Sequence, residues 1–230
     1  MRGLLWLVAL TSFAIPDCEG TDLAQAREQM VLTQIASRGV HDPLTLAAMR
    51  RVPRHLFVPP ASVSQAYEDH PIPIGFGQTI SQPYIVAFMT EALGLRGGES
   101  VLEVGTGCGY QAAVLAEIAA RVYSIEIVEP LASEAAERLK RLGYAKVSVR
   151  AGDGYLGWPD AAPFDGIMVT AAAPRIPEPL RQQLRDGGRL IVPVGEEWQE
   201  LVLVTRHGAR FDERRVLPVR FVPMTGKVRQ

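Results

Sequence analysis

One stretch limits the fold and chemistry of this chain more than any other: residues 101–110, with the sequence VLEVGTGCGY. A short apolar run that contains Glu103, followed by glycines at alternate positions, predicts a buried strand, a tight turn and a helix beginning near Gln111. Glycine allows positive φ and lets a ligand approach without a Cβ atom in the way, and the next helix presents unpaired N–H groups. The stretch therefore predicts a nucleotide-type cofactor site, with an ordinary turn as the simpler alternative.

The type of cofactor depends on two residues that flank the glycines. A dinucleotide fingerprint requires Gly or Ala where this chain has Tyr110, which weakens the interpretation as a pyrophosphate site. Glu103 brings a carboxylate toward the turn, which repels phosphates and favours a ligand that carries an ammonium or a sulfonium. S-adenosyl-L-methionine carries both cations, so it is the cofactor that this pattern favours.

The second predicted strand supports a cofactor site independently. Residues 121–126 form a β-rich run that ends in Glu126, about 20 residues beyond the glycines, where a carboxylate can accept hydrogen bonds from both ribose hydroxyls. Two linked features of this kind are much less frequent by chance than one.

Composition sets the broad class. The chain has 230 residues, enough for one substantial domain, with a net charge of −1 and interleaved charges of both signs. No basic patch for nucleic acid is present, which disfavours a nucleic-acid methyltransferase. The two cysteines, Cys18 and Cys108, predict no disulfide framework, and no cluster of metal ligands is visible in the sequence.

Residues 1–20 differ from the rest of the chain. Arg2 precedes an apolar run over residues 4–15, a pattern that resembles a secretory signal and is short for a membrane span. The following Pro16-Asp17 is a poor cleavage region, so an apolar N-terminal tail or a start codon placed too far upstream is the alternative.

The first part of the remaining chain is expected to form a helical cap and a substrate loop over residues 21–95. We predict a helix from Thr21 or Asp22 to Gly39, a second from Asp42-Pro43 to Val52-Pro53, and an extended segment over residues 54–60. Prolines and glycines in residues 67–83 predict an irregular loop, and its apolar content and length favour a functional one. As a structural role for Ser81, we expect it to cap a helix over residues 83–93.

Residues 96–230 are expected to form the cofactor-binding sheet and C-terminal strands. Alternating helices and strands predict a mostly parallel sheet with helices on both faces, and residues 200–217 predict an antiparallel hairpin around His207-Gly208. Gly187-Gly188 is expected to separate a helix from a strand. The further elements expected here are helices at 111–120, 130–142 and 177–184, strands ending at 127, 150, 170 and 194, and an extended segment at 219–224.

Several separate stretches resemble the protein-L-isoaspartate O-methyltransferases, over about residues 27–225. The loop GQTISQP at residues 77–83 is specific to that family, whereas the glycine turn is shared by many methyltransferases. The other matching stretches are Met30-Val31, Arg38-Gly39-Val40, residues 52–59 (VPRHLFVP), residues 73–75 (PIG), Gly152-Asp153-Gly154 and residues 187–195 (GGRLIVPVG).

The resemblance implies a class I S-adenosylmethionine-dependent methyltransferase fold, Rossmann-like, in one domain over residues 21–230. It also implies methyl transfer to the α-carboxylate of L-isoaspartyl residues in damaged proteins, giving S-adenosyl-L-homocysteine and an ester that collapses to a succinimide. A carboxylate is already ionised at neutral pH, so no general base is needed and alignment with exclusion of water is sufficient.

The resemblance further assigns roles to individual residues. Ser81 is expected to orient the substrate carboxylate, and the remaining residues are expected to contact the cofactor. We expect the loop of Thr79, Ile80, Ser81 and Gln82 to close over the cofactor, and Glu103 with the backbone of Gly105, Gly107 and Cys108 to hold its methionine part. Glu126 is expected to bind its ribose, and Asp153 and Gly154 are expected to bind its adenine. Thr225 and Gln230 are expected to close the site.

Three alternatives stay open at this stage. They are a related methyltransferase acting on another carboxylate or a small molecule, a non-catalytic cofactor- or peptide-binding module, and, more distantly, a nicotinamide dehydrogenase. The family and the cytoplasmic source of S-adenosylmethionine favour a cytoplasmic monomer without nucleic-acid partner or stable membrane association; residues 1–20 leave a periplasmic or secreted location as the alternative. The four histidines are scattered and are expected to be structural.

Overall fold

The computed structural model of the protein describes residues 18–229, so the predictions that concern residues 1–17 and Gln230 lie outside the described part. Within residues 18–229, no helix is both long enough and apolar enough to cross a membrane.

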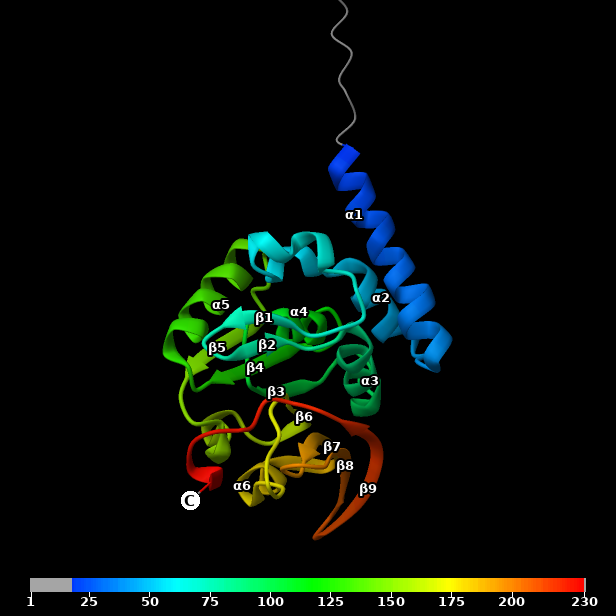
Figure 1. Cartoon of the computed structure of the whole chain (residues 1–230). Coiled ribbons are helices and arrows are strands. Elements are labelled where there is room, and N and C mark those ends of the chain that lie inside the picture. The colour runs from blue at the N-terminus through cyan, green and yellow to red at the C-terminus, as the bar shows by residue number, and fades with distance from the viewer. Residues whose placement is uncertain (1–17, 230) are drawn as a thin grey trace, which may run out of the picture.

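A seven-stranded sheet forms the centre of the molecule, in the order β5-β4-β3-β6-β7-β8-β9 (Figure 1). The first five strands in this order are parallel, and β8 and β9 continue the sheet in antiparallel fashion. The predicted class, a mostly parallel sheet with an antiparallel C-terminal part, is confirmed. The strands are β3 (Ser100–Val104), β4 (Arg121–Glu126), β5 (Val147–Ala151), β6 (Phe164–Val169), β7 (Leu184–Val194), β8 (Gln199–His207) and β9 (Arg210–Val219).

Alternation of side chains along the strands gives the sheet two buried faces. Leu102 and Val104 belong to one apolar cluster, with α6 (Glu178–Gln182) and part of the C-terminal segment. Val101 belongs to the other, which includes residues of α2 (Pro43–Arg51), α3 (Pro83–Leu93) and α4 (Tyr110–Ala116). The amphipathic helix α5 (Glu129–Arg141) packs beside β4 and β5.

The N-terminal part of the described chain is helical. α1 (Cys18–Gln29) continues into a π-helical turn at Met30–Ile35 and a short 3₁₀ turn, and it ends at Gly39 with φ of +95°. The Asp42 side chain caps α2 by accepting a hydrogen bond from the Thr45 backbone N–H, and Pro43 occupies the first turn. Buried Met30 and Ile35 join this helical part to the core below the sheet.

The extended segment predicted for residues 54–60 is wrong. Two 3₁₀ helices, Arg54–Phe57 and Pro60–Gln65, occupy this region. The buried Arg54 side chain donates from Nε to the Ala66 carbonyl at 2.8 Å and lies over the Tyr110 ring, 4.9 Å from its centroid. These tertiary contacts fold the chain back on itself, against the extended preference of residues next to proline.

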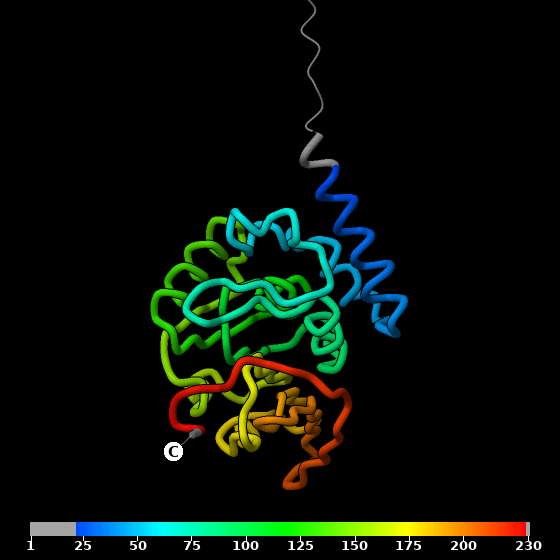
Figure 2. Tube along the Cα trace, in the orientation of Figure 1, coloured from blue at the N-terminus to red at the C-terminus, as the bar shows by residue number. Residues whose placement is uncertain are grey.

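The loop predicted for residues 67–83 contains a regular hairpin. β1 (Ile72–Gly75) pairs with β2 (Gln78–Ile80), and Gly75 at the end of β1 and the two turn residues Phe76 and Gly77 all have positive φ. Figure 2 shows this hairpin crossing in front of the parallel strands. The prediction that Ser81 caps α3 is also wrong, because Gln82 is the N-cap residue and α3 has no side-chain cap.

The C-terminal part corrects one further boundary. β7 runs through Gly187-Gly188, so these glycines do not separate a helix from a strand. They form an irregularity in the strand, where Gly187 has φ of +79°. Helix α6 is shorter than expected. Beyond β9, the chain returns across the sheet, and bridge pairing of Ala172 with Pro223 fixes its course.

Candidate functional site

A narrow cavity lies at the carboxyl ends of β3, β4 and β6, where ligands bind in open α/β sheets. Its volume is ≈ 60 Å³, below the range of about 300–1,000 Å³ typical of ligand pockets. Residues of β2 line one side of the cavity and the C-terminal segment lines another. The lining residues are Gln78, Thr79, Val104, Gly105, Gly107, Ile125, Glu126, Ile127, Gly154, Thr170, Ala171, Val222, Pro223, Met224 and Thr225.

The glycine turn forms the floor of this cavity. Gly105 has φ of +101°, and a Cβ atom there would collide with the Thr170 hydroxyl, which donates to the Gly105 carbonyl at 2.6 Å. The backbone N–H of Gly105 donates to the Ile125 carbonyl at 2.8 Å, which ties the turn to the end of β4. Only glycine fits this position, as the sequence pattern predicts.

Glu126 joins the second strand to the turn. One carboxylate oxygen accepts a hydrogen bond from the Gly107 N–H at 2.8 Å, and the other accepts from the Val128 N–H at 3.0 Å. Each carboxylate oxygen can accept more than one hydrogen bond, so Glu126 retains acceptor capacity toward the cavity. This arrangement fits the predicted recognition of a ribose diol.

Glu103 lies behind the cavity wall instead of on it. Its side chain is on the sheet face covered by α3 and α4, has 0% exposure and accepts a short hydrogen bond from the Ser124 hydroxyl, while Oε1 has no partner. Burial raises the pKa of Glu103 to about 8, opposed by the Ser124 hydrogen bond and assisted by the charge of Glu126. The carboxyl is therefore mainly protonated at neutral pH, and it is not a free anion facing a ligand.

Tyr110 is buried and packs against the N-terminal part of the chain. Its ring is fully buried at the start of α4 and meets Phe57 of the cap edge to face, with ring centroids 5.5 Å apart. This contact joins α4 to the 3₁₀ helix at Arg54–Phe57. Cys108, also buried, does not line the cavity, and its carbonyl accepts a hydrogen bond from Arg138.

Asp153 anchors the C-terminal segment. Its Oδ1 accepts from the Tyr155 N–H at 2.9 Å and its Oδ2 from the Lys227 N–H at 2.8 Å. Asp153 itself is not among the cavity residues, whereas the neighbouring Gly154 and the more distant Thr225 are. The structure thus brings the predicted adenine residues and the predicted closing residue together through backbone contacts.

The side chains of residues 79–82, the loop expected to close over the cofactor, point in different directions. Thr79 lines the cavity, Ile80 is buried in the core, and the Gln82 side chain donates to Asp69 at 2.8 Å. Ser81 is half-buried at the junction of β2 and α3, and in the described residues its hydroxyl forms no hydrogen bond. Ser81 is not among the residues that line the cavity.

Some lining residues were not expected from the sequence. Three of them directly follow the carboxyl end of a parallel strand: Ile127 follows β4, and Thr170 and Ala171 follow β6. Ligands bind at such strand ends, so the predicted ends of these strands could have indicated these residues. Residues 222–224 carry no such local signal.

The cavity has properties that suit S-adenosyl-L-methionine. It combines a floor of glycines with positive φ, a carboxylate at the end of β4, and, just behind the floor, a buried carboxyl oxygen without a partner. Among the described lining residues there is no histidine, cysteine or lysine to act as a base or nucleophile. The arrangement therefore suits a transfer between two groups that are already activated.

Comparison with known proteins identifies close relatives. The sequence model of the family Protein-L-isoaspartate(D-aspartate) O-methyltransferase (PCMT) matches residues 25–229. Protein-L-isoaspartate O-methyltransferase 1 of Syntrophobacter fumaroxidans is 58% identical over 204 residues, which cover 88% of this chain and 95% of the relative. The protein-L-isoaspartate O-methyltransferase of Opitutus terrae is 58% identical over 201 residues, 86% of each chain.

Solved structures give the same result. One protein-L-isoaspartate O-methyltransferase is similar with a TM-score of 0.81 and 32% identity, over 88% of this chain and 67% of that one. A Plasmodium falciparum protein described as a protein-L-isoaspartate O-methyltransferase, in complex with S-adenosyl-L-homocysteine, gives 0.74 and 25% identity, over 86% and 98%.

Proposed function

The chain belongs to the protein-L-isoaspartate(D-aspartate) O-methyltransferase family, and from this premise we propose that it methylates the α-carboxylate of L-isoaspartyl residues in damaged proteins, using S-adenosyl-L-methionine. The resulting ester collapses to a succinimide, whose hydrolysis returns part of the material to aspartate. The observation that carries the proposal is the single cavity where the glycine turn, Glu126 and the β1–β2 hairpin with Thr79 meet.

Backbone and carboxylate groups hold the cofactor in this proposal. When bound, S-adenosyl-L-methionine supplies a methyl group that its sulfonium already activates. Glu126 accepts hydrogen bonds from the ribose hydroxyls, the backbone at Gly105 and Gly107 holds the methionine part, and Gly154 faces the adenine with Thr225 beside it. The backbone conformation at Gly105 is fixed independently of the cofactor, because its positive φ and the Thr170 hydroxyl admit no Cβ atom.

The substrate side needs orientation more than activation. The isoaspartyl α-carboxylate is ionised at neutral pH and acts directly as the nucleophile. Ser81 donates a hydrogen bond that aligns one carboxylate oxygen, and the β1–β2 hairpin excludes water above it. Alignment and dehydration are then the main contributions of the protein to the rate.

Glu103 has a positioning role in this scheme. Its carboxyl lies behind the turn and is bonded to Ser124, whose hydroxyl is also 2.6 Å from that of Thr106 in the turn. A cation bound at the turn favours the ionised form of Glu103 and lowers its pKa from about 8. Glu103 therefore stabilises the turn from behind and responds to the charge of the ligand.

We also propose that residues 21–230 act as one methyltransferase domain, as a cytoplasmic monomer without nucleic-acid partner or stable membrane association. Interleaved surface charge and a core shared by cap and sheet support this. Light scattering after gel filtration measures the mass, and mass spectrometry of the N-terminus in cell fractions measures the location. A dimer, or processing near Gly20 in an extracytoplasmic fraction, would contradict these assignments.

The decisive experiment compares two peptides that differ only in L-isoaspartate or L-aspartate at one position. Radiolabelled S-adenosyl-L-methionine is expected to place base-labile label on the isoaspartyl peptide alone. Transfer to neither peptide, with S-adenosyl-L-homocysteine still bound in calorimetry, would indicate a small carboxylate substrate or a non-catalytic binding module. Transfer to both would contradict isoaspartyl specificity.

A further inference from the structure

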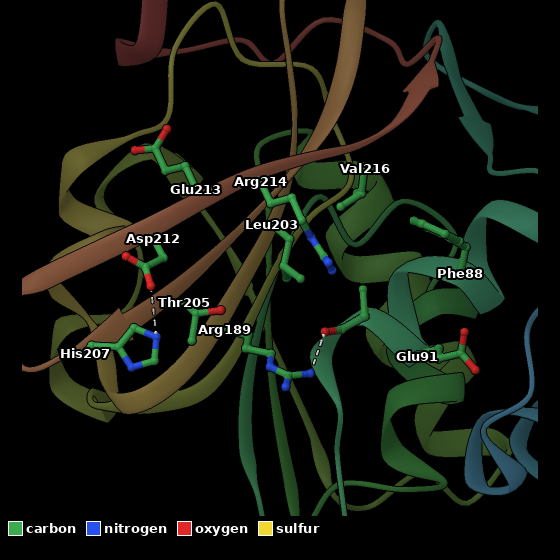
Figure 3. Close-up of a pocket in the computed structure, with 11 residues that line it drawn as sticks. Phe88, Glu91, Arg189, Leu203, Thr205, His207, Asp212, Glu213, Arg214 and Val216 are labelled. Carbon is green, nitrogen blue, oxygen red and sulfur yellow. Dashed lines mark hydrogen bonds and ion pairs between the residues drawn. The ribbon is translucent and has the colours of Figure 1, made fainter.

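A second cavity lies between α3 and the face of β7, β8 and β9, and it shares no lining residue with the cofactor cavity (Figure 3). Its volume is ≈ 480 Å³, within the range of about 300–1,000 Å³ that is typical of small-molecule sites. Arg189 lies in the middle of β7 and pairs with Thr205, whereas the carboxyl end of β7 is at Val194. The second cavity therefore lies toward the amino ends of the parallel strands, away from the cofactor cavity.

We propose that this cavity binds a small organic anion, a carboxylate or phosphate with an apolar body, between Arg189 and Arg214. In Figure 3 the two guanidinium groups enter the cavity from different strands, Arg189 from β7 and Arg214 from β9. Planar guanidinium groups suit carboxylate and phosphate oxygens because they present parallel N–H donors.

The two arginines retain unused donors. Arg189 donates from one Nη to the Ala92 carbonyl at 3.2 Å, and its guanidinium lies over Gly94, where a Cβ atom would collide with it. This contact positions the group, and among residues 18–229 its other N–H groups have no hydrogen-bond partner. The backbone of Arg214 pairs with Leu203 in the β8–β9 ladder, and within residues 18–229 its side chain has no hydrogen bond or ion pair.

The carboxylates that line the cavity are engaged elsewhere. Glu91 accepts hydrogen bonds from the backbone N–H groups of His41 and Asp42, at 2.7 and 2.6 Å. Asp212 faces His207 at 3.4 Å, and Glu213 pairs with Arg181. None of the three forms an ion pair with Arg189 or Arg214 in residues 18–229, so an external anion would supply the missing charge.

The rest of the lining defines the body of the ligand. Phe88 of α3, Leu203 of β8 and Val216 of β9 provide an apolar wall beside the arginines. Thr205 lies on the same face of β8 as Leu203, and its hydroxyl is a further hydrogen-bond donor. A phenyl or short alkyl group therefore fits beside the charged group, and inorganic phosphate alone leaves this apolar surface uncovered.

The test is titration of the full-length protein with phenyl phosphate, followed by isothermal calorimetry and amide chemical shifts. We expect a submillimolar dissociation constant, which R189Q and R214Q each weaken by about tenfold or more. The matched control is R215Q, which removes the same charge from the next residue of β9, on the opposite face of the sheet. Its affinity should equal that of the unmodified protein, and all variants should bind S-adenosyl-L-homocysteine normally.

Several results would overturn the proposal. Absence of phenyl phosphate binding at millimolar concentration, or equal losses in R214Q and R215Q, would exclude a built site. Inorganic phosphate binding as tightly as phenyl phosphate would exclude the apolar contribution. Binding of a glutamate-rich peptide in preference to phenyl phosphate, sensitive to the same substitutions, would mean that a protein segment occupies the cavity. These readouts are independent of methyl transfer, and thus of the proposed function.

Discussion

The cofactor cavity and the second cavity differ in the groups that form their walls. The cofactor cavity, in the parallel half of the sheet, is formed largely by backbone at glycines, with one carboxylate fixed by two N–H groups, and measures ≈ 60 Å³. The second cavity, in the antiparallel half, is formed by long charged and apolar side chains and measures ≈ 480 Å³. A site formed by backbone atoms tolerates few substitutions, because the same atoms form the strands and turns of the fold. A site formed by side chains can be altered by substitution without unfolding the protein.

The largest expected effect is at Gly105. G105A places a Cβ atom against the Thr170 hydroxyl at φ of +101°, and we expect S-adenosyl-L-homocysteine affinity to fall at least about 100-fold. The free energy of unfolding should fall by about 1–3 kcal/mol. Calorimetry and urea denaturation measure the two quantities. The control is G98A, at an exposed glycine with no atom near the added methyl group, and it should change neither the affinity nor the free energy of unfolding. An unaffected G105A would contradict the view that the backbone of the cofactor cavity tolerates no substitution.

The second prediction concerns the buried carboxyl behind the turn. The folded pKa of Glu103 is about 8 against 4.5 for the ordinary group, so between these values the unfolded chain releases a proton that the folded chain keeps. The free energy of unfolding of the ligand-free protein should therefore decrease as pH rises through this window, by up to about 1.4 kcal/mol per pH unit from this group, and level off above pH 8.

E103Q should remove that part of the pH dependence, because an amide has no proton to release. Urea denaturation at a series of pH values measures it, with E134Q on the exposed face of α5 as the control. Identical pH dependence in E103Q and the unmodified protein would contradict the raised pKa.

A smaller effect is expected where a side chain acts in the backbone-built cavity. S81A should lower kcat/KM for an isoaspartyl peptide by about tenfold, because one oriented hydrogen bond contributes about 1–2 kcal/mol. The affinity for S-adenosyl-L-homocysteine should not change. Steady-state kinetics with S64A, an exposed serine of the second 3₁₀ helix, provides the control. Full activity of S81A would remove Ser81 from the mechanism.

The smallest effect is expected in the second cavity. R214Q should change the free energy of unfolding by less than about 0.5 kcal/mol, since Arg214 is exposed and unbonded in the described chain, and should leave methyl transfer unchanged. Thermal denaturation and the peptide assay measure both. A clear loss of activity would show that the two cavities are coupled, although they share no lining residue.

The difference between the cavities also explains which features are predictable from sequence. The glycine turn and Glu126 were placed correctly in the structure because each depends on a few adjacent residues. The 3₁₀ helix at Arg54–Phe57 was not predicted, since its cause is the contact of Arg54 with Ala66 and Tyr110. The β1–β2 hairpin was hidden by its prolines and by three consecutive residues with positive φ.

The site itself was only partly predictable. Glu103 was expected to face the ligand, yet strand alternation places it on the other face of the sheet from Val104, which lines the cavity. Residues 222–224 became part of the cavity because Pro223 pairs with Ala172, a contact between distant parts of the chain. The functional roles of Ser81 and of the cofactor residues remain predictions that the variants above test.

That return of the C-terminal segment to the cofactor cavity has a consequence for biosynthesis. Translation proceeds from the N-terminus, so β3, β4 and β6 leave the ribosome before Val222–Thr225, which form one wall of the cavity. A nascent chain that has already formed its parallel strands still lacks this wall. Cofactor capture therefore has to follow the emergence of residue 225, and a ribosome stalled earlier would display a folded sheet unable to retain its ligand.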